Sequence, residues 1–212
     1  MIDILFPKVL EVEKQLSDIV KPTVVLLLIC SVVTLALAFT NSLTKDKIAE
    51  AARLEEESAR KEVLSLAESF EEIQGLEAVI NDNEALFPVK KAFVGFKGED
   101  AIGRVFLTET KGYGGTIKIT VGIDSEGTIT GVKIGDNNET PGLGSKAKDE
   151  PFISQFQGIS PKGALTVVKN NKTKDEEIDA ISGATITSKA VTKAVQAALN
   201  VNTELSKLEG DL

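Results

Sequence analysis

Hydrophobic and polar positions follow three different patterns along the chain. From Thr23 to Phe39 no residue is charged, and 23 uncharged residues separate Lys21 from Lys45. Between residues 59 and 73 apolar residues recur every three or four positions, which is the period of a helix. From residue 101 the period changes to two, which is typical of strands. The order of these patterns predicts a membrane helix, then a helical stalk, then a domain that contains strands.

The uncharged segment predicts a transmembrane helix over residues 22–40. At about 1.5 Å per residue, it spans roughly 30 Å of hydrocarbon. A buried helix of a globular protein would carry a charge within about 14 residues. A secretory signal peptide is the other alternative, because Ala36-Leu37-Ala38 resembles a cleavage site. Four acidic residues among the first 21 make a poor signal-peptide start, so we expect a retained anchor with Cys30 in its middle.

Charge does not determine the orientation of this anchor. Three basic residues lie within about 15 positions on each side of the span, so the positive-inside rule gives no preference. They are Lys8, Lys14 and Lys21 on one side, and Lys45, Lys47 and Arg53 on the other. Residues 1–21 form an amphipathic segment, whose apolar face could lie on the membrane surface or against a partner helix. That face consists of Val9, Val12, Leu16 and Ile19.

Residues 41–84 predict an acidic helical stalk, and residues 85–212 a separate domain. Residues 41–80 carry 5 basic and 10 acidic side chains, which is most of the chain's net charge of −8. Asn41 and Ser42 could cap a new helix, or the membrane helix could continue through them. The helical stripe ends at Gly75 and consists of Ala59, Val63, Leu66, Phe70 and Ile73.

The domain combines strands with a long helix. Thr116 to Ile123 alternates between apolar and polar residues, residues 124–127 form a turn, and Thr128 to Ile134 resumes extended structure. This pattern predicts a β-hairpin. We also expect a strand at Gly163–Lys169 and a helix from about Thr187 to Leu205. Helices together with antiparallel strands predict an α+β domain.

The composition excludes several kinds of chemistry. The 212 residues include no histidine and one cysteine, so the chain cannot build a Ser-His-Asp triad, a zinc-thiolate site, an iron–sulfur cluster or an internal disulfide. The negative net charge argues against nucleic-acid binding. The remaining candidates for chemistry are hydroxyls, carboxylates, lysines, backbone groups and a bound cofactor.

Three glycine-bearing loops are the candidate functional segments. They are G-Y-G-G at 112–115, E-T-P-G-L-G-S at 139–145, and D-A-I-S-G-A-T-I-T-S at 179–188. Each taken alone fits an ordinary turn or a helix cap. The third opens a helix, where free N–H groups and the helix dipole favour phosphate. It lacks the lysine of a P-loop and the G-x-G-x-x-G of a Rossmann site. The alternative to non-covalent phosphate binding is a covalent phosphate ester on a threonine of this loop.

The third loop resembles the covalent flavin-attachment motif of the FMN-binding domain family, S/T-G-A-T/S-x-T, in which the last threonine is modified. The other two loops are similar to the remaining signatures of that family, in the same order, over roughly residues 100–200. With its anchor and stalk, the chain resembles the G subunits of Rnf-type ion-pumping ferredoxin:NAD oxidoreductases. The C subunits of sodium-pumping NADH:quinone reductases are related and typically longer.

The resemblance implies that Thr187 carries FMN through a phosphoester, which a separate flavin transferase installs from FAD after activating the hydroxyl. Thr185 is the competing acceptor. The transfer would take place outside the cytoplasmic membrane, which would put residues 1–21 inside and the domain outside. The resemblance also assigns roles to the loops. The phosphate and ribityl pocket would be shaped by Ser182, Gly183, Ala184 and Thr185. The isoalloxazine ring would be contacted by Glu139, Thr140, Gly142, Leu143 and Gly144, with Leu143 on its face, and Tyr113 would approach the flavin.

The function implied is a membrane-anchored flavoprotein that relays electrons within a multisubunit redox-driven ion pump. Such a chain would catalyse no complete reaction alone and would need membrane and peripheral partner subunits. Two other functions remain open: a tethered extracytoplasmic interaction domain without redox activity, and a free-standing extracytoplasmic flavin reductase component.

Overall fold

The computed structural model describes residues 5–80, 83–161 and 163–210, with side chains from Ile19 to Leu208. The chain divides into two compact units, Met1–Leu54 and Glu55–Leu212. Each unit is described separately below. The start of the predicted amphipathic segment, residues 1–4, lies outside the described residues.

The first unit is helical and belongs to α1 (Leu5–Val63), a helix of 59 residues. The helix passes through Pro22 and continues through Asn41 and Ser42, so these two residues do not cap a new helix. By length and composition it includes one candidate membrane span, within Ile19–Val63. No side chain of the apolar window is buried by the described chain. An uncovered apolar surface of this length fits a lipid environment.

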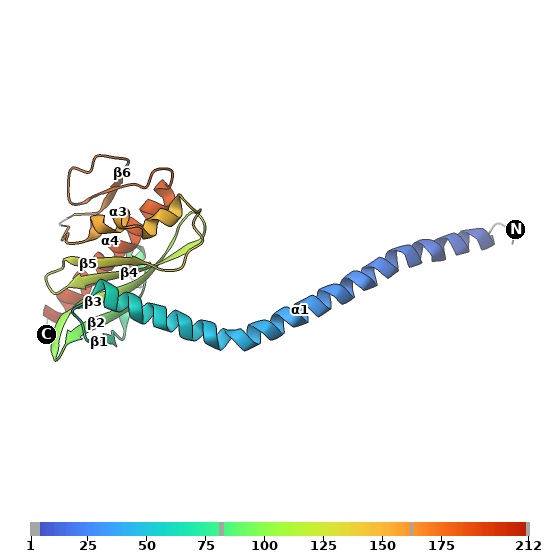
Figure 1. Ribbon diagram of the computed structural model, residues 1–212, viewed down its shortest axis with the longest axis horizontal. Coiled ribbons are helices and arrows are strands. Elements are labelled where there is room, and N and C mark those ends of the chain that lie inside the picture. Colours follow the sequence, from blue (N-terminus) through green and yellow to red (C-terminus); the bar gives the residue numbers. More distant parts are fainter. Residues whose placement is uncertain (1–4, 81–82, 162, 211–212) are drawn as a thin grey trace. The chain divides into compact units, whose positions relative to one another are not determined.

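The second unit is built on a five-stranded antiparallel sheet with the strand order β1-β2-β3-β4-β5 (Figure 1). The strands are β1 (Ser69–Glu72), β2 (Val89–Lys97), β3 (Asp100–Lys111), β4 (Thr116–Asp124) and β5 (Ile129–Ile134). The predicted hairpin is confirmed as β4 and β5, with Val121 paired to Val132. Sequential neighbours pair throughout this sheet, so each strand turns back beside the one before it.

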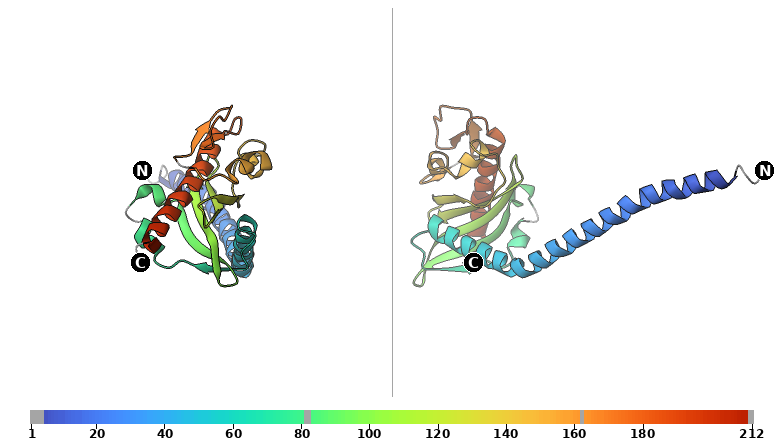
Figure 2. Two further views of the ribbon diagram at one scale, coloured as in Figure 1. Left: turned by 90° about the vertical axis from the view of Figure 1, so that its left-hand side faces the viewer. Right: turned by 45° about the vertical axis from the view of Figure 1, so that its right-hand side comes forward.

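Helix α4 (Thr185–Gly210) crosses one face of the sheet and closes the main core (Figure 2). Along α4, Val191 and Val195 are completely buried, four residues apart as the helical period requires. They pack in one cluster with Phe106 of β3 and Ile119 of β4. Full burial of each such side chain contributes about 1.5–3 kcal/mol. The core therefore fixes α4, and with it the N-terminal turn of α4, against the sheet.

The last turn of α1, which belongs to the second unit, packs on the other face. Val63 and Val105 are buried in a second, smaller cluster. The Thr130 hydroxyl of β5 donates a hydrogen bond to the Val63 carbonyl. Gly131 lets the helix backbone approach, because a Cβ there would lie 3.0 Å from the Val63 Cα. The end of α1 is thus part of the domain and is bonded to its sheet.

Shorter elements complete the second unit. They are α2 (Leu76–Ile80), η1 (Glu84–Leu86), η2 (Gly144–Lys148), α3 (Glu150–Ile153), η3 (Ser154–Phe156), β6 (Thr166–Val168) and β7 (Glu177–Asp179). The strand expected at 163–169 is confirmed as β6, although it pairs with β7 in parallel, in a small sheet of its own.

The α+β class is confirmed, and the helical stripe over residues 59–73 is correct only up to Val63. Residues 69–72 form β1, which pairs with β2. Gly95 of β2 has no side chain where Leu64 and Ala67 approach, so the residues that follow α1 can pack closely on this strand. The described residues between 55 and 84, which the sequence pattern assigns to the stalk, fall within the compact second unit. Helix α4 begins two residues before the predicted start.

Candidate functional site

The three glycine-bearing loops meet around one cavity of about 510 Å³. Nine of the eleven predicted residues line this cavity, and only Ser182 and Gly142 do not. Ile186, which the sequence reasoning missed, is the additional lining residue. The full lining is Tyr113, Glu139, Thr140, Leu143, Gly144, Gly183, Ala184, Thr185, Ile186 and Thr187. Segments more than 60 residues apart in sequence thus form one site.

The first turn of α4 presents unpaired backbone donors to this cavity. The N–H of Ser188 donates to the Ala184 carbonyl, whereas in the described chain no hydrogen bond is recorded for the N–H groups of residues 185–187. Gly183 precedes the turn with φ of +77°, a left-handed conformation that favours glycine. Free N–H groups and the positive end of the helix dipole make this turn a phosphate site.

Thr187 lies at the floor of the cavity and is bonded to a buried carboxylate. Its side chain is 1% exposed and that of Glu139 is 7% exposed. The Thr187 hydroxyl donates to Glu139 Oε2 over 2.6 Å. Glu139 Oε1 accepts from the Gly114 N–H over 2.9 Å. Among the described residues no lysine or arginine forms an ion pair with Glu139.

Glycines from two of the loops pack closely around this carboxylate. A Cβ at Gly112 would collide with Glu139 Oε1, and one at Gly144 would collide with Glu139 Oε2. A Cβ at Gly114 would collide with the carbonyl of the residue before Glu139. Gly112 and Gly144 are therefore required by the packing of the Glu139 side chain, and Gly114 by the close approach of a backbone carbonyl. Gly142 has another role, in a turn with φ of +76°.

The rim of the cavity is apolar and exposed. Tyr113, Leu143 and Ile186 are 71%, 43% and 56% exposed, and each comes from a different loop. Such large exposed apolar groups around a concavity are typical of a binding surface. The remaining predicted hydroxyl residues, Ser182, Thr185 and Thr140, are not buried. Thr185 therefore differs from Thr187, which is buried.

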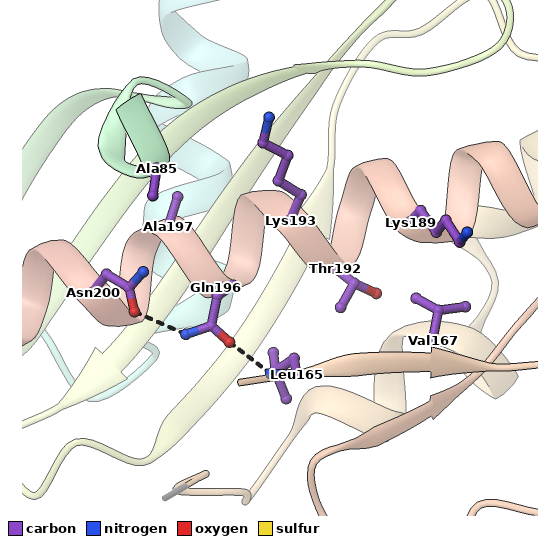
Figure 3. A pocket seen from close by; sticks show the side chains of 9 residues that line it. All are labelled: Ala85, Leu165, Val167, Lys189, Thr192, Lys193, Gln196, Ala197 and Asn200. Atoms are coloured by element: carbon purple, nitrogen blue, oxygen red, sulfur yellow. Dashed lines mark hydrogen bonds between the residues drawn. The ribbon is translucent and has the colours of Figure 1, made fainter. Parts of the chain in front are cut away.

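A second cavity of about 300 Å³ lies between α4 and the β6 segment (Figure 3). Gln196 of α4 accepts from the Leu165 N–H over 2.7 Å and donates to Asn200 over 2.8 Å. Lys189 and Lys193 stand at its rim. The polar groups at its floor bond one another, which fits a structural role in holding the β6 segment on α4.

The described residues contain no group of three or more histidine, cysteine or acidic side chains that could hold a metal ion. The first cavity instead offers backbone N–H groups, one buried hydroxyl and an apolar rim. This combination suits a phosphate-bearing molecule with a planar apolar ring.

Comparison with known proteins agrees with this geometry. The family described as FMN-binding domain matches residues 112–200, which include all three loops. A second family, the RnfG N-terminal region, matches residues 14–63. The G subunit of the Na⁺-translocating ferredoxin:NAD⁺ oxidoreductase complex of Acetobacterium woodii is 38% identical over 189 residues, which cover 86% of this chain and 91% of that protein. The chain belongs to the family of G subunits of ion-translocating oxidoreductase complexes.

Other members of this family differ in the ion they are named for. The G subunit of the proton-translocating complex of Clostridium ljungdahlii is 40% identical over 127 residues, which cover 58% of this chain and 68% of that protein. Among solved structures, Shewanella oneidensis NqrC is 26% identical with a TM-score of 0.47, covering 57% of this chain and 61% of that one.

Proposed function

We propose that FMN is attached to Thr187 through a phosphoester and that the chain is an electron-transfer flavoprotein subunit of an ion-translocating ferredoxin:NAD⁺ oxidoreductase. The observation that carries the proposal is the Thr187 hydroxyl, at the floor of a cavity and in the first turn of α4. Membership of the G-subunit family and the match to an FMN-binding domain support it.

The residues of the cavity suit each part of the flavin. The free N–H groups of the first turn of α4 would hold the phosphate, aided by the helix dipole. Gly183 and Ala184 leave room for the ribityl chain beside this turn. Tyr113, Leu143 and Ile186 would enclose the ring and exclude water from its faces. FMN supplies one- and two-electron transfer when bound, while the protein supplies position and electrostatics.

The exposed rim also bears on how the chain would exchange electrons. A ring held between side chains that are 43–71% exposed would lie close to the protein surface. Redox partners could then approach it without any opening of the core. Such exchange fits a chain that works beside the other subunits of a complex, as the names of its relatives indicate for them.

The surroundings of the chain follow from the same proposal. Residues 22–40 would cross the cytoplasmic membrane, with the N-terminus inside and the FMN domain on the extracytoplasmic side. A flavin transferase would load the domain there. The partners would be the membrane and peripheral subunits of the ion pump, and co-purification with them separates this function from a free-standing reductase component.

The mass of the intact protein after acid denaturation tests the attachment. We expect the native chain, expressed with an active flavin transferase, to gain the mass of one FMN less one water. Thr187→Val should lack this adduct, whereas the matched control Thr185→Val should retain it. An adduct that persists in Thr187→Val would move the site. Complete absence from the native chain would favour the interaction-domain alternative.

A further inference from the structure

We propose that Glu139 is the proton acceptor for the Thr187 hydroxyl when the flavin phosphoester forms, so that the chain itself, and not the flavin transferase as the resemblance implies, activates this hydroxyl. This inference rests on the proposed function. The structure places the Glu139 carboxylate against the hydroxyl of Thr187, on the oxygen that would become the ester oxygen.

The geometry meets the requirement for a general base. The distance of 2.6 Å between Thr187 Oγ1 and Glu139 Oε2 lies at the short end of the range for proton transfer and is typical of a hydroxyl bonded to an ionised carboxylate. A hydroxyl has one hydrogen and two lone pairs. Because the hydrogen is directed to Glu139, the lone pairs of Thr187 Oγ1 point elsewhere and are available to a phosphorus atom.

The environment of Glu139 is unusual for a purely structural acceptor. Its side chain is 7% exposed, its recorded donors are the Thr187 hydroxyl and the Gly114 N–H, and no cation of the described residues pairs with it. Burial of a carboxylate without a cation is costly. A glutamine at this position would avoid that cost, but its single acceptor oxygen could keep only one of the two hydrogen bonds. A carboxylate, in contrast, can take up the proton that the reaction releases.

Gly144 keeps the hydroxyl open to the cavity. A Cβ at this position would lie 2.8 Å from Thr187 Oγ1 and would collide with Glu139 Oε2. It would therefore fill the space from which a phosphorus atom must approach and would also displace the base. Thr185 has no such arrangement: it is exposed, and its hydroxyl forms no hydrogen bond with another described residue. The position of Glu139 thus selects Thr187 over Thr185.

The step balances as a phosphoryl-group substitution without oxidation or reduction. Thr187 Oγ1 attacks the flavin-side phosphorus of FAD, a dinucleotide held by the transferase. The new bond joins Oγ1 to that phosphorus, and the anhydride bond to the adenylate half breaks, releasing AMP. The hydroxyl proton passes to the Glu139 carboxylate and from there to solvent.

The test is the initial rate at which purified flavin transferase and FAD load the full-length chain in detergent. Glu139→Gln keeps the size and an acceptor oxygen, and general-base catalysis contributes about 10²–10⁴-fold. We expect kcat for this variant to fall by at least about 100-fold while KM for the chain stays within about twofold. Glu150→Gln, which removes an exposed carboxylate outside the cavity, is the matched control and should load at the native rate.

A second variant covers the case in which Glu139→Gln disturbs the fold. Glu139→Ala should load slowly, and added formate, which supplies a carboxylate to the vacated space, should restore part of the rate. Native-rate loading of Glu139→Gln, or a rise in KM with unchanged kcat, overturns the inference and leaves the proposed function standing. Failure of the native chain to load, or loading of Thr187→Val, overturns both.

Discussion

At the scale of single residues, the site depends on glycines that serve different purposes. Gly183 is needed for its backbone conformation, with φ of +77° before the first turn of α4. Gly112 and Gly144 are needed because a side chain would collide with the Glu139 carboxylate. The same residue type in three similar-looking loops thus answers two separate physical requirements.

Gly183→Ala tests the conformational requirement. We expect it to lower the stability of the domain by about 1–2 kcal/mol, because an L-residue resists the left-handed region. It should also slow flavin loading, since the added Cβ would lie 3.0 Å from Leu143 Cδ2 at the cavity rim. Gly158→Ala is the matched control, because Gly158 has φ of +73° and nothing within 4 Å. Thermal unfolding should show the same loss of stability in both variants. Mass spectrometry should show slower flavin loading in Gly183→Ala alone.

The loops that form the site can be predicted from sequence, but the hydrogen bonds between their side chains cannot. The three loops are recognisable because each has an ordered motif, and they do gather around one cavity. The bond between Glu139 and Thr187 joins residues 48 positions apart. The spacing of apolar residues within one element cannot predict a contact over such a distance in sequence. The family resemblance implies a contact between Glu139 and the flavin ring, and the structure adds a hydrogen bond from the Thr187 hydroxyl to its carboxylate, which the resemblance does not imply. Ile186 escapes prediction because only the fold shows that it faces the cavity.

At the scale of elements, the junction between α1 and the sheet depends on close backbone approach. Gly131→Ala would put a Cβ 3.0 Å from the Val63 Cα, and backbone cannot move as cheaply as a side chain. Overpacking of this kind costs about 1–3 kcal/mol. Gly135→Ala on the same segment, with its nearest atom at 3.5 Å, should be nearly neutral. Urea unfolding followed by circular dichroism measures both, and equal midpoints would contradict this account.

The segment around β7 should respond to acid through Glu177. Backbone and side-chain hydrogen bonds from Thr173 lower the pKa of Glu177 below its ordinary value. A lowered pKa in the folded state means that this interaction stabilises the fold above the ordinary carboxyl pKa. Its contribution is lost as the pH falls through the folded pKa. Thr173→Val should move the pKa back toward the ordinary value in an NMR titration, and an unchanged pKa would exclude the side-chain bond as a cause.

Elements with a regular pattern are predictable from sequence, and those with interrupted patterns are not. The hairpin of β4 and β5 alternates cleanly and α4 repeats every four residues, so the pattern reveals both. Strand β2 is missed, because register shifts between Val89 and Lys91 and between Gly95 and Phe96 break its alternation. Phe70 and Ile73 continue the three- and four-residue spacing of the helix although the chain has already left it, so the pattern places the end of α1 too late.

At the scale of the whole molecule, the chain combines an uncovered apolar helix with a compact domain. Leu28→Lys would place a charge near the middle of the proposed span, at a cost of about 2.5–3.5 kcal/mol for insertion. We expect a large fraction of this variant to be lost from membranes in flotation and carbonate-extraction assays. Leu54→Lys, at a similarly exposed position of α1 outside residues 22–40, should remain in the membrane fraction. Equal retention of both variants would argue against the proposed span.

The bond between Glu139 and Thr187 has a consequence for the protein before it is loaded. The carboxylate lies against the first turn of α4, so the chain's own negative charge already occupies the surroundings of the phosphate site. Free phosphate and free FMN would meet electrostatic repulsion from this carboxylate as they approach the free N–H groups of the turn. The unloaded protein would accordingly bind free anions weakly. It would hold flavin through the covalent bond to Thr187.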